Sequence, residues 1–271
     1  MNIDGKLVLV GAGKMGGAML QGWLSRGVSA DRIVILDPSP APEIGELIAQ
    51  HKLAHNPAID SIDGVSVLMI AVKPQVMAEV LPGLRPLADQ KPLILSVAAG
   101  KTTATFEAAF GADKAVIRAM PNTPAAVGRG ITVIYPNANV SPAQLALGQE
   151  LLSAIGEVAT ISDEALMDPV TAVSGSGPAY VFYMTECLAE AGVKAGLPAD
   201  LAMTLARATI AGAGELMRVS GIEAAVLRKN VTSPNGTTAA ALDVLMAGDG
   251  LQPLMDRAVE AASRRSRELA G

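Results

Sequence analysis

Residues 7–16 read Leu7-Val8-Leu9-Val10-Gly11-Ala12-Gly13-Lys14-Met15-Gly16, so that four apolar residues lead into three glycines. The apolar run predicts a buried β-strand, and the apolar stripe of the next segment, Met15 to Arg26, predicts a helix that ends at Gly27. Glycines at this spacing between a strand and a helix allow a tight turn, close approach of a pyrophosphate and close helix packing. We therefore predict a dinucleotide-binding loop, the alternative being a strand-to-helix turn without a ligand. Its predicted contacts are Gly11, Ala12, Gly13, Lys14, Met15 and Gly16.

Short apolar runs recur through the first 160 or so residues. They are continuously apolar rather than alternating, which is typical of central parallel strands with helices on both faces. This pattern predicts a doubly wound α/β sheet of the Rossmann type. The candidate strands are Leu7–Val10, Ile33–Leu36, Val67–Val72, Leu93–Val97, Ala115–Ala119, Ile131–Tyr135 and Glu157–Thr160. Ser141 and Pro142 read as the N-cap and first residue of a helix.

Strand-like runs stop after about Ile161, and long segments rich in Ala, Leu and Met follow. Such segments predict an all-α half. The candidate helices are Asp163–Val173, Pro178–Ala195, Ala199–Val219, Thr237–Ala247 and Leu251–Leu269. We predict two domains: a dinucleotide-binding Rossmann domain over residues 1–161, and a helical substrate-binding and dimerisation domain over residues 162–271.

The size and hydropathy of the chain agree with this division. Its 271 residues exceed the roughly 100 to 200 of one domain. Half of the residues are apolar, yet runs such as Val65–Val72 are far shorter than the roughly 18 residues of a membrane helix. Because the N-terminal residues also lack the pattern of a secretory signal, we expect a soluble, cytoplasmic protein without a membrane partner.

Charge and cysteine content exclude other classes. A net charge of -5, with no dense basic cluster beyond Arg264, Arg265 and Arg267, argues against nucleic-acid binding. Cys187 is the only cysteine, so neither an internal disulfide nor a cysteine zinc cluster is expected, and no metal site is predicted. We expect a buried, inert thiol at this position.

Asp37 ends the second candidate strand, 21 residues after Gly16. A carboxylate there accepts hydrogen bonds from the adenosine ribose and repels a 2′-phosphate, which favours NADH over NADPH. Asp37 could instead only initiate the turn Asp37-Pro38-Ser39-Pro40. Because Ser39 could help to bind a 2′-phosphate, the cofactor stays open as NADPH or NADH.

Three more loops leave the predicted strands at their carboxyl ends, where ligands bind in such sheets. We expect the first two to border the nicotinamide half, although Lys73 could be a solvated loop residue. The third is rich in proline and should form a wall beside the cofactor. The predicted contacts are Ala71, Val72, Lys73 and Pro74, then Val97, Ala98 and Ala99, then Met120, Pro121 and Asn122.

Two polar interruptions divide the helical half. The first, Ser174 to Tyr180, has glycines before Pro178 and predicts a helix start, with or without a ligand. The second, Asn230 to Thr238, precedes an apolar helix, so its N–H groups and hydroxyls suit a carboxylate. Plain N-capping by Thr237 is the alternative. The predicted substrate contacts are Ser176, Asn230, Val231, Ser233, Gly236, Thr237 and Thr238.

The segment Ala199–Val219 is apolar around more of its circumference than one stripe requires. A helix of this kind must be buried on several sides, and a domain of roughly 110 residues has little interior to offer. We therefore predict an obligate oligomer formed through the helical half. The apolar positions are Leu201, Met203, Leu205, Ile210, Leu216 and Met217.

Four motifs together resemble those of pyrroline-5-carboxylate reductases, in the order of that family along nearly the whole chain. They are Ala71-Val72-Lys73-Pro74-Gln75, Met120-Pro121-Asn122-Thr123-Pro124, Ala172-Val173-Ser174-Gly175-Ser176-Gly177-Pro178-Ala179-Tyr180 and Val231-Thr232-Ser233-Pro234-Asn235-Gly236-Thr237-Thr238. The Ser-Pro-x-Gly-Thr-Thr element is the most specific. Asn235 stands where the family usually has Gly, and because Asn tolerates left-handed backbone we expect the loop to survive.

The resemblance implies a reaction and an assembly. It implies hydride transfer to the C=N bond of 1-pyrroline-5-carboxylate to give L-proline, with Thr238 contacting the ring nitrogen and Ser233, Gly236 and Thr237 around the carboxylate. It places Asn56 near the adenosine end of the cofactor. It also implies a helical domain that interlocks with its twin in a homodimer, with rings of dimers possible.

Two rival functions make different demands on the sequence. A β-hydroxyacid dehydrogenase of the same two-domain type would carry a lysine base early in the helix after the glycines, and Pro178 to Val193 contains none. A non-catalytic dinucleotide sensor would need the glycine loop but not the threonine-rich motif. His51 and His55 lie between two predicted strands, where we expect surface residues away from the site.

Overall fold

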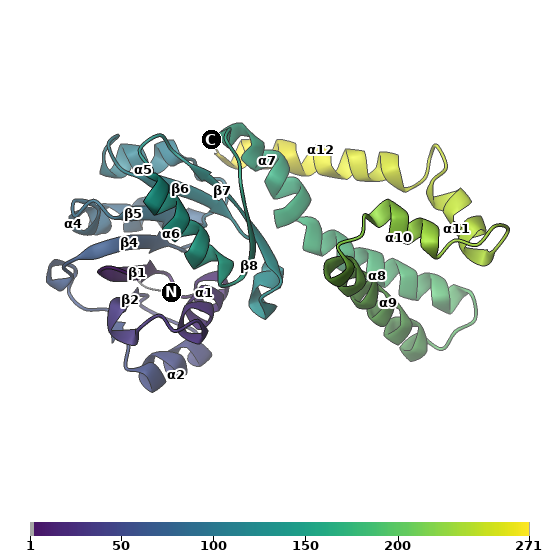
Figure 1. Ribbon diagram of the computed structural model, residues 1–271, viewed down its shortest axis with the longest axis horizontal. Helices are drawn as coiled ribbons and strands as arrows, with labels where there is room; N and C mark the ends of the chain where they lie inside the picture. Colours follow the sequence, from purple (N-terminus) through teal and green to yellow (C-terminus); the bar gives the residue numbers. More distant parts are fainter. Residues whose placement is uncertain (1–2, 271) are drawn as a thin grey trace. The chain divides into compact units, whose positions relative to one another are not determined.

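The computed structural model describes residues 3–270 and contains one eight-stranded sheet (Figure 1). The spatial order is β3-β2-β1-β4-β5-β6-β7-β8, and every neighbouring pair is parallel except β6 and β7. The strands are β1 (Lys6–Val10), β2 (Ile33–Leu36), β3 (Ala54–His55), β4 (Val65–Ile70), β5 (Leu93–Ser96), β6 (Val116–Met120), β7 (Gly130–Pro136) and β8 (Gly156–Thr160).

All seven predicted strands are confirmed, with ends that differ by at most two residues. Strand β3 was not predicted because its two residues are both exposed and carry no apolar pattern. Strand β7 runs antiparallel to β6 because only residues 121–129 join them, fewer than the dozen or more that a parallel crossover needs.

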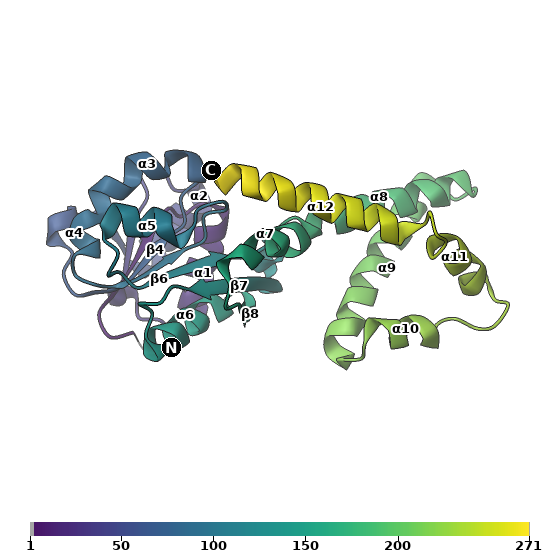
Figure 2. The same cartoon turned by 90° about the horizontal axis from the view of Figure 1, so that it is seen from above.

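Helices cover both faces of the sheet (Figure 2). On one face Leu7 and Leu9 pack in a core with Trp23, whose indole Nε1 donates to the carbonyl of Leu151 at 2.9 Å. On the other face Val8 and Val10 pack in a second core. The first face is covered by α1 (Lys14–Ser25), α2 (Pro42–His51) and α6 (Pro142–Ser153), and the second by α3 (Met77–Val80), η4 (Leu81–Leu84), α4 (Arg85–Ala88) and α5 (Thr103–Phe110).

The predicted helix starts of the first half are confirmed. Helix α6 begins with a capping box, in which the Ser141 hydroxyl accepts the Gln144 N–H at 3.2 Å and the Gln144 side chain accepts the Ser141 N–H at 3.0 Å. Short 3₁₀ turns connect many of the remaining elements: η1 (Ala30–Arg32), η2 (Ile59–Ser61), η3 (Pro74–Val76), η5 (Thr123–Val127) and η6 (Glu164–Leu166).

The second half of the chain is helical as predicted, with two differences. The expected helix Asp163–Val173 is wrong as a single helix: it is divided into η6, α7 (Met167–Val170) and a π-helical turn, Thr171–Gly175. One short helix was not predicted. The long helices are α8 (Gly177–Lys194), α9 (Ala199–Ser220), α11 (Thr237–Leu245) and α12 (Leu251–Ala270), and the short one is α10 (Ala224–Asn230).

Contacts between Cα atoms divide the chain into two compact units. The first contains residues 3–175 together with 263–270, and the second contains residues 176–262. Residues 162–175 therefore belong to the same compact unit as the sheet, and so do the last turns of α12. No helix among the described residues is long and apolar enough to span a bilayer.

The helical unit buries few of its apolar side chains. Helices α8 and α9 pack against each other through small residues, and Ala189, Ala202 and Ala206 are the buried positions of this pair. Leu205 and Leu216 are about half exposed, at 47% and 53%. The expectation of a buried thiol is wrong for the single chain, because Cys187 lies on an exposed part of α8.

Candidate functional site

The predicted cofactor residues all follow the carboxyl ends of parallel strands at one edge of the sheet. Residues 11–16 follow β1, Asp37 and Ser39 follow β2, and Asn56 follows β3. Residues 71–74 follow β4, residues 97–99 follow β5, and residues 120–122 lie at the end of β6. Because strands β1 to β6 are mutually parallel, the topology brings these segments to the same edge.

The three glycines of the first loop have different surroundings. Gly11 has a φ of 87°, and a Cβ there would lie 3.0 Å from the Ala71 backbone. A Cβ on Gly16 would lie 2.1 Å from the Gly11 carbonyl oxygen, so only glycine permits this contact between the start of α1 and the end of β1. Gly13 is exposed, and a Cβ there would meet nothing within 4 Å. The loop is therefore closed on the protein side and open at Gly13.

The N-terminus of α1 offers unpaired backbone donors at this opening. Gly13 is its N-cap and contributes no side-chain cap, and the first helical hydrogen bond runs from the Gly17 N–H to the Gly13 carbonyl at 2.7 Å. The N–H groups of residues 13–16 have no partner within residues 3–270 and are available to an anion, which a helix N-terminus also favours electrostatically. The loop thus fits a dinucleotide pyrophosphate.

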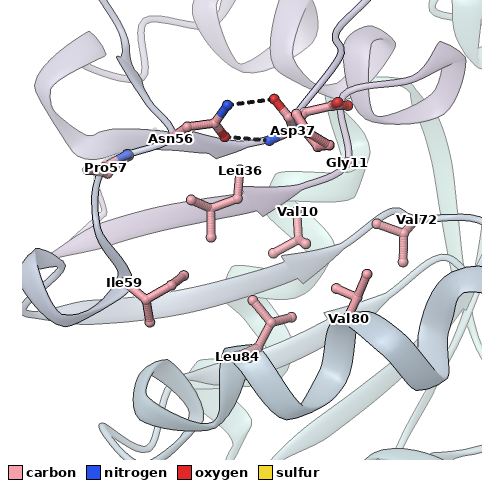
Figure 3. Close-up of a pocket in the computed structure, with 12 residues that line it drawn as sticks. Val10, Gly11, Leu36, Asp37, Asn56, Pro57, Ile59, Val72, Val80 and Leu84 are labelled. Carbon is pink, nitrogen blue, oxygen red and sulfur yellow. Dashed lines mark hydrogen bonds between the residues drawn. The ribbon is translucent and has the colours of Figure 1, made fainter.

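A cavity of about 380 Å³ adjoins the loop (Figure 3). Its size lies in the range of small-molecule sites, and its walls are apolar apart from Asp37 and Asn56. These properties fit the adenosine half of a dinucleotide. The lining residues are Val10, Gly11, Leu36, Asp37, Pro38, Asn56, Pro57, Ile59, Val72, Val80, Gly83 and Leu84. Of these, only Gly11, Asp37, Asn56 and Val72 were predicted as cofactor contacts.

The Asp37 carboxylate is held by backbone donors. Its Oδ2 accepts the Ala12 N–H at 2.7 Å, which ties the end of β2 to the glycine loop. Its Oδ1 accepts the Ser39 N–H at 2.8 Å. Asp37 therefore does shape the turn after β2, and at the same time its half-buried carboxylate lines the cavity.

Asn56 holds the main chain of Asp37 from the neighbouring strand. Its Oδ1 accepts the Asp37 N–H at 2.9 Å, and its Nδ2 donates to the Asp37 carbonyl at 2.8 Å, the two bonds drawn in Figure 3. Its own backbone is left-handed, with a φ of 48°. The side-chain amide is thus committed to Asp37, and Asn56 forms a wall of the cavity.

His55 lies closer to this cavity than expected. It is an exposed residue, as predicted, but its Nε2 is 3.0 Å from the Asp37 carbonyl oxygen. Because β3 pairs with β2, His55 lies beside Asp37, which is one of the predicted cofactor residues. His51 ends α2 and makes no such contact among the described residues.

The loop after β5 is partly exposed, whereas the loop after β6 is fixed by hydrogen bonds within the protein. Ala98 is buried whereas Ala99 is exposed, so the first loop turns outward. In the second loop Asn122 is committed to the protein: its Oδ1 accepts the Ile131 N–H at 3.0 Å and its Nδ2 lies 3.3 Å from the Ser174 carbonyl. A Cβ on Gly175 would clash with Met120 Cε at 2.4 Å, so the π-helical turn lies directly against this loop.

Of the two lysines predicted at this edge, Lys14 is the first residue of α1 and Lys73 precedes η3. Both are exposed. Neither forms an ion pair within the part of the chain that the structure describes. Their charges remain available to an anionic ligand.

The predicted substrate residues lie in the helical unit, most of them around the start of α11. This helix begins at Thr237, and its N-cap is Gly236, which has no side chain to cap it. Capping by Thr237 is therefore wrong. The hydroxyls of Thr237 and Thr238 make no hydrogen bond within residues 3–270. The helix start thus presents unused N–H groups and hydroxyls together.

The loop before α11 is tightly built. Asn235 has a φ of 60°, which confirms the left-handed conformation expected where the family usually has Gly. A Cβ on Gly236 would lie 2.4 Å from Ser233 Oγ, so Ser233 closes over the helix start. Asn230 ends α10, and Val231 is exposed. Ser176 is the N-cap of α8 and is half-buried.

The resolved pKa shifts belong to exposed groups outside these residues. A hydrogen bond from Ser29 lowers the pKa of Asp31, and one from Lys194 lowers the pKa of Glu190. A hydrogen bond with Cys187 raises the pKa of Tyr183. Each of these three pKa shifts is caused by a neighbouring side chain on the same turn or helix. None of them involves a predicted site residue.

Fold and site together define a class: a Rossmann-type dinucleotide-dependent oxidoreductase with a helical second part. Two family models agree, since residues 6–100 match "NADP oxidoreductase coenzyme F420-dependent" and residues 164–269 match "Pyrroline-5-carboxylate reductase dimerisation". A pyrroline-5-carboxylate reductase of Pseudomonas aeruginosa is 40% identical over 98% of this chain and 97% of its own. The chain belongs to the pyrroline-5-carboxylate reductase family, whose members are NAD(P)-dependent oxidoreductases.

Solved structures agree with this assignment. A pyrroline-5-carboxylate reductase from Coxiella burnetii superposes with a TM-score of 0.92 at 31% identity, covering 99% of this chain and 100% of that one. A pyrroline carboxylate reductase from Plasmodium falciparum, solved with NADP bound, gives 0.80 at 29% identity and covers 98% of both chains.

Proposed function

We propose that this protein reduces the C=N bond of 1-pyrroline-5-carboxylate with NADH or NADPH and forms L-proline. The observation that carries the proposal is the start of α11, where Thr237 and Thr238 offer hydroxyls without partners among the described residues beside uncapped N–H groups. Such a cluster of donors suits a small carboxylate with a polar ring atom.

The residues of α11 act by binding and orienting the substrate. The Thr238 hydroxyl contacts the ring nitrogen, and the carboxylate lies among Ser233, Gly236 and Thr237. Ser176, Asn230 and Val231 complete the substrate site. The bound reduced dinucleotide supplies a hydride to the carbon of the C=N bond. Because a cyclic imine is basic enough to arrive partly protonated, positioning is the main catalytic contribution of the protein.

The cofactor binds along the sheet edge described above. The pyrophosphate lies at residues 11–16, and the adenosine lies in the cavity with Asp37, Ser39 and Asn56. The nicotinamide half is bordered by the loops with residues 71–74, 97–99 and 120–122. The open Gly13 and the apolar cavity support this orientation.

The Asp37 carboxylate favours NADH, because its charge repels a 2′-phosphate. We expect a lower KM for NADH than for NADPH, and a shift toward NADPH in Asp37→Ser. One unit-charge contact at 4 Å is worth about 1 kcal/mol in water, so the ratio of kcat/KM values should change by roughly fivefold or more. Steady-state kinetics with both cofactors measure this ratio.

Asp60→Ser is the matched control, since Asp60 is exposed on η2 outside the cavity lining and loses the same charge. It should leave the ratio unchanged. Equal or better use of NADPH by the native protein would show that Asp37 only shapes the turn.

The two functions divide along the chain as the sequence predicts. Residues 1–161 bind the dinucleotide, and residues 162–271 bind the substrate and pair the subunits of a homodimer. The dimerisation model over residues 164–269 and the exposed apolar side chains of α8 and α9 support the pairing. We place the enzyme in the cytoplasm.

A turnover assay tests the proposed function. The imine with NADH or NADPH should give dinucleotide oxidation that depends on both reactants. A β-hydroxyacid with the oxidised dinucleotide should give no reduction. Binding of the dinucleotide without turnover of either substrate would instead favour a non-catalytic sensor.

A further inference from the structure

The loop between β5 and α5, residues 97–102, borders the nicotinamide half in the proposed function. Its first residues are held by the sheet, since the Val97 N–H donates to the Ile70 carbonyl at 3.1 Å and Ser96 Oγ lies 3.3 Å from the Ala98 nitrogen. Beyond Ala98 the loop turns through Gly100, which has a φ of 72°. After this turn, the Lys101 N–H donates to the Ala98 carbonyl oxygen at 3.4 Å.

Helix α5 follows this loop, and the side chain of its N-cap residue makes no capping hydrogen bond. Thr102 is the N-cap of α5, but its side chain accepts no backbone N–H and lies 3.5 Å from the Thr105 hydroxyl. Glu164 takes over this role. Its Oε1 accepts the Thr103 N–H and its Oε2 accepts the Thr103 hydroxyl, both at 2.8 Å. A carboxylate at a helix N-terminus is favoured by the helix dipole as well as by these bonds.

Arg118 fixes the Glu164 carboxylate. Its guanidinium Nη1 lies 3.1 Å from Glu164 Oε1, and its side chain is 6% exposed against 22% for Glu164. Replacing Glu164 by a neutral residue would leave the buried Arg118 charge uncompensated, which is destabilising. The pair therefore joins three elements at one point: η6, the start of α5 and strand β6.

The last turn of α12 lies against the other side of the same loop. A Cβ on Gly100 would lie 3.2 Å from the Leu269 carbonyl oxygen. This turn is anchored in the same unit, because the buried Ser266 donates its hydroxyl to Asp168 Oδ1 at 2.7 Å. Segments far along the chain thus hold the loop from two sides.

We propose that Glu164 is a positioning residue for the cofactor, which acts by capping α5 and thereby setting the loop at residues 97–102. The proposal rests on the proposed function in placing the nicotinamide half at this loop. Glu164 is also the first residue of the segment that matches the dimerisation model, so the cofactor loop depends on a residue outside the dinucleotide-binding part.

Glu164→Gln and Glu107→Gln test this role as a matched pair. Both residues contact α5: Glu107 lies on the helix itself and accepts the Asn137 Nδ2–H at 2.7 Å, on the side away from the loop. Each variant keeps the side-chain shape and loses one charge. The first readout is NADH binding to the protein without substrate, followed by fluorescence titration, with Tm measured in parallel.

Glu164→Gln should raise the Kd of NADH roughly three- to tenfold, since a charge-assisted hydrogen bond that sets the loop becomes a neutral one. Amide hydrogen exchange over residues 97–103 should become faster in the same variant. Glu107→Gln keeps an amide oxygen that can accept the Asn137 Nδ2–H, so it should leave both readouts at their native values. Thr103→Val, which removes only the hydroxyl contact, should show a smaller effect in the same direction.

Native NADH affinity in both Glu164→Gln and Thr103→Val would overturn the positioning role. So would an equal loss of affinity in Glu107→Gln, because the effect would then not depend on the contacts of Glu164 with Thr103. A native protein that binds neither NADH nor NADPH would overturn the proposed function itself, and the positioning role with it.

Discussion

Thr238→Ala should lower kcat/KM for the imine by roughly 10- to 150-fold, which corresponds to the about 1.5 to 3 kcal/mol of one hydrogen bond to a charged partner. Thr238 is half-buried in the first turn of α11, and its hydroxyl has no partner within residues 3–270 that would explain its presence structurally. The dinucleotide affinity should stay nearly unchanged, because the glycine loop and the cavity belong to the other compact unit.

Steady-state kinetics and NADH titration measure the two effects separately. Thr204→Ala is the control: its hydroxyl donates to the Asp200 carbonyl of its own helix at 2.8 Å, so the variant removes a threonine hydroxyl with a structural partner. It should keep native kcat/KM. A fully active Thr238→Ala protein would remove this hydroxyl from the mechanism.

Dilution below the dissociation constant of the dimer should abolish activity and folding together. The helical unit leaves large apolar side chains uncovered on α8 and α9, among them Phe182 at 61% and Leu216 at 53% exposure. Exposed large apolar side chains on both helices support an obligate interface, and the stability of an obligate oligomer depends on its own concentration.

Light scattering and sedimentation at decreasing protein concentration give the assembly state, with circular dichroism and turnover measured on the same samples. The three signals should fall over one concentration range. A folded, active monomer would contradict both the obligate oligomer and the interlocked dimer predicted from the sequence.

The sequence predicted the sheet well because its central strands are buried on both faces. Leu7 to Val10 and Ile33 to Leu36 are short, continuous apolar runs followed by Gly11 and Asp37, and this pattern is typical of central parallel strands. The elements that were missed lack this signal. Strand β3 has two exposed residues, and α10 is a short helix without a buried side chain.

The site was predictable only where its residues are local in sequence. The glycine loop and the start of α11 carry their chemistry within a few neighbouring residues. The contacts of His55 with Asp37 and of Glu164 with Thr103 depend instead on which segments the fold brings together, across 18 and 61 residues of chain. Cys187 was misassigned because its apolar helix remains uncovered in the single chain.

The central claim is that this protein transfers a hydride to the C=N carbon of 1-pyrroline-5-carboxylate. The most direct measurement uses NADH deuterated at nicotinamide C4, with the proline product analysed by mass spectrometry and NMR. The account predicts L-proline with one deuterium on the δ carbon, the former imine carbon, from one of the two C4-labelled forms of NADH. Binding of NADH without formation of deuterated proline from either form would contradict it.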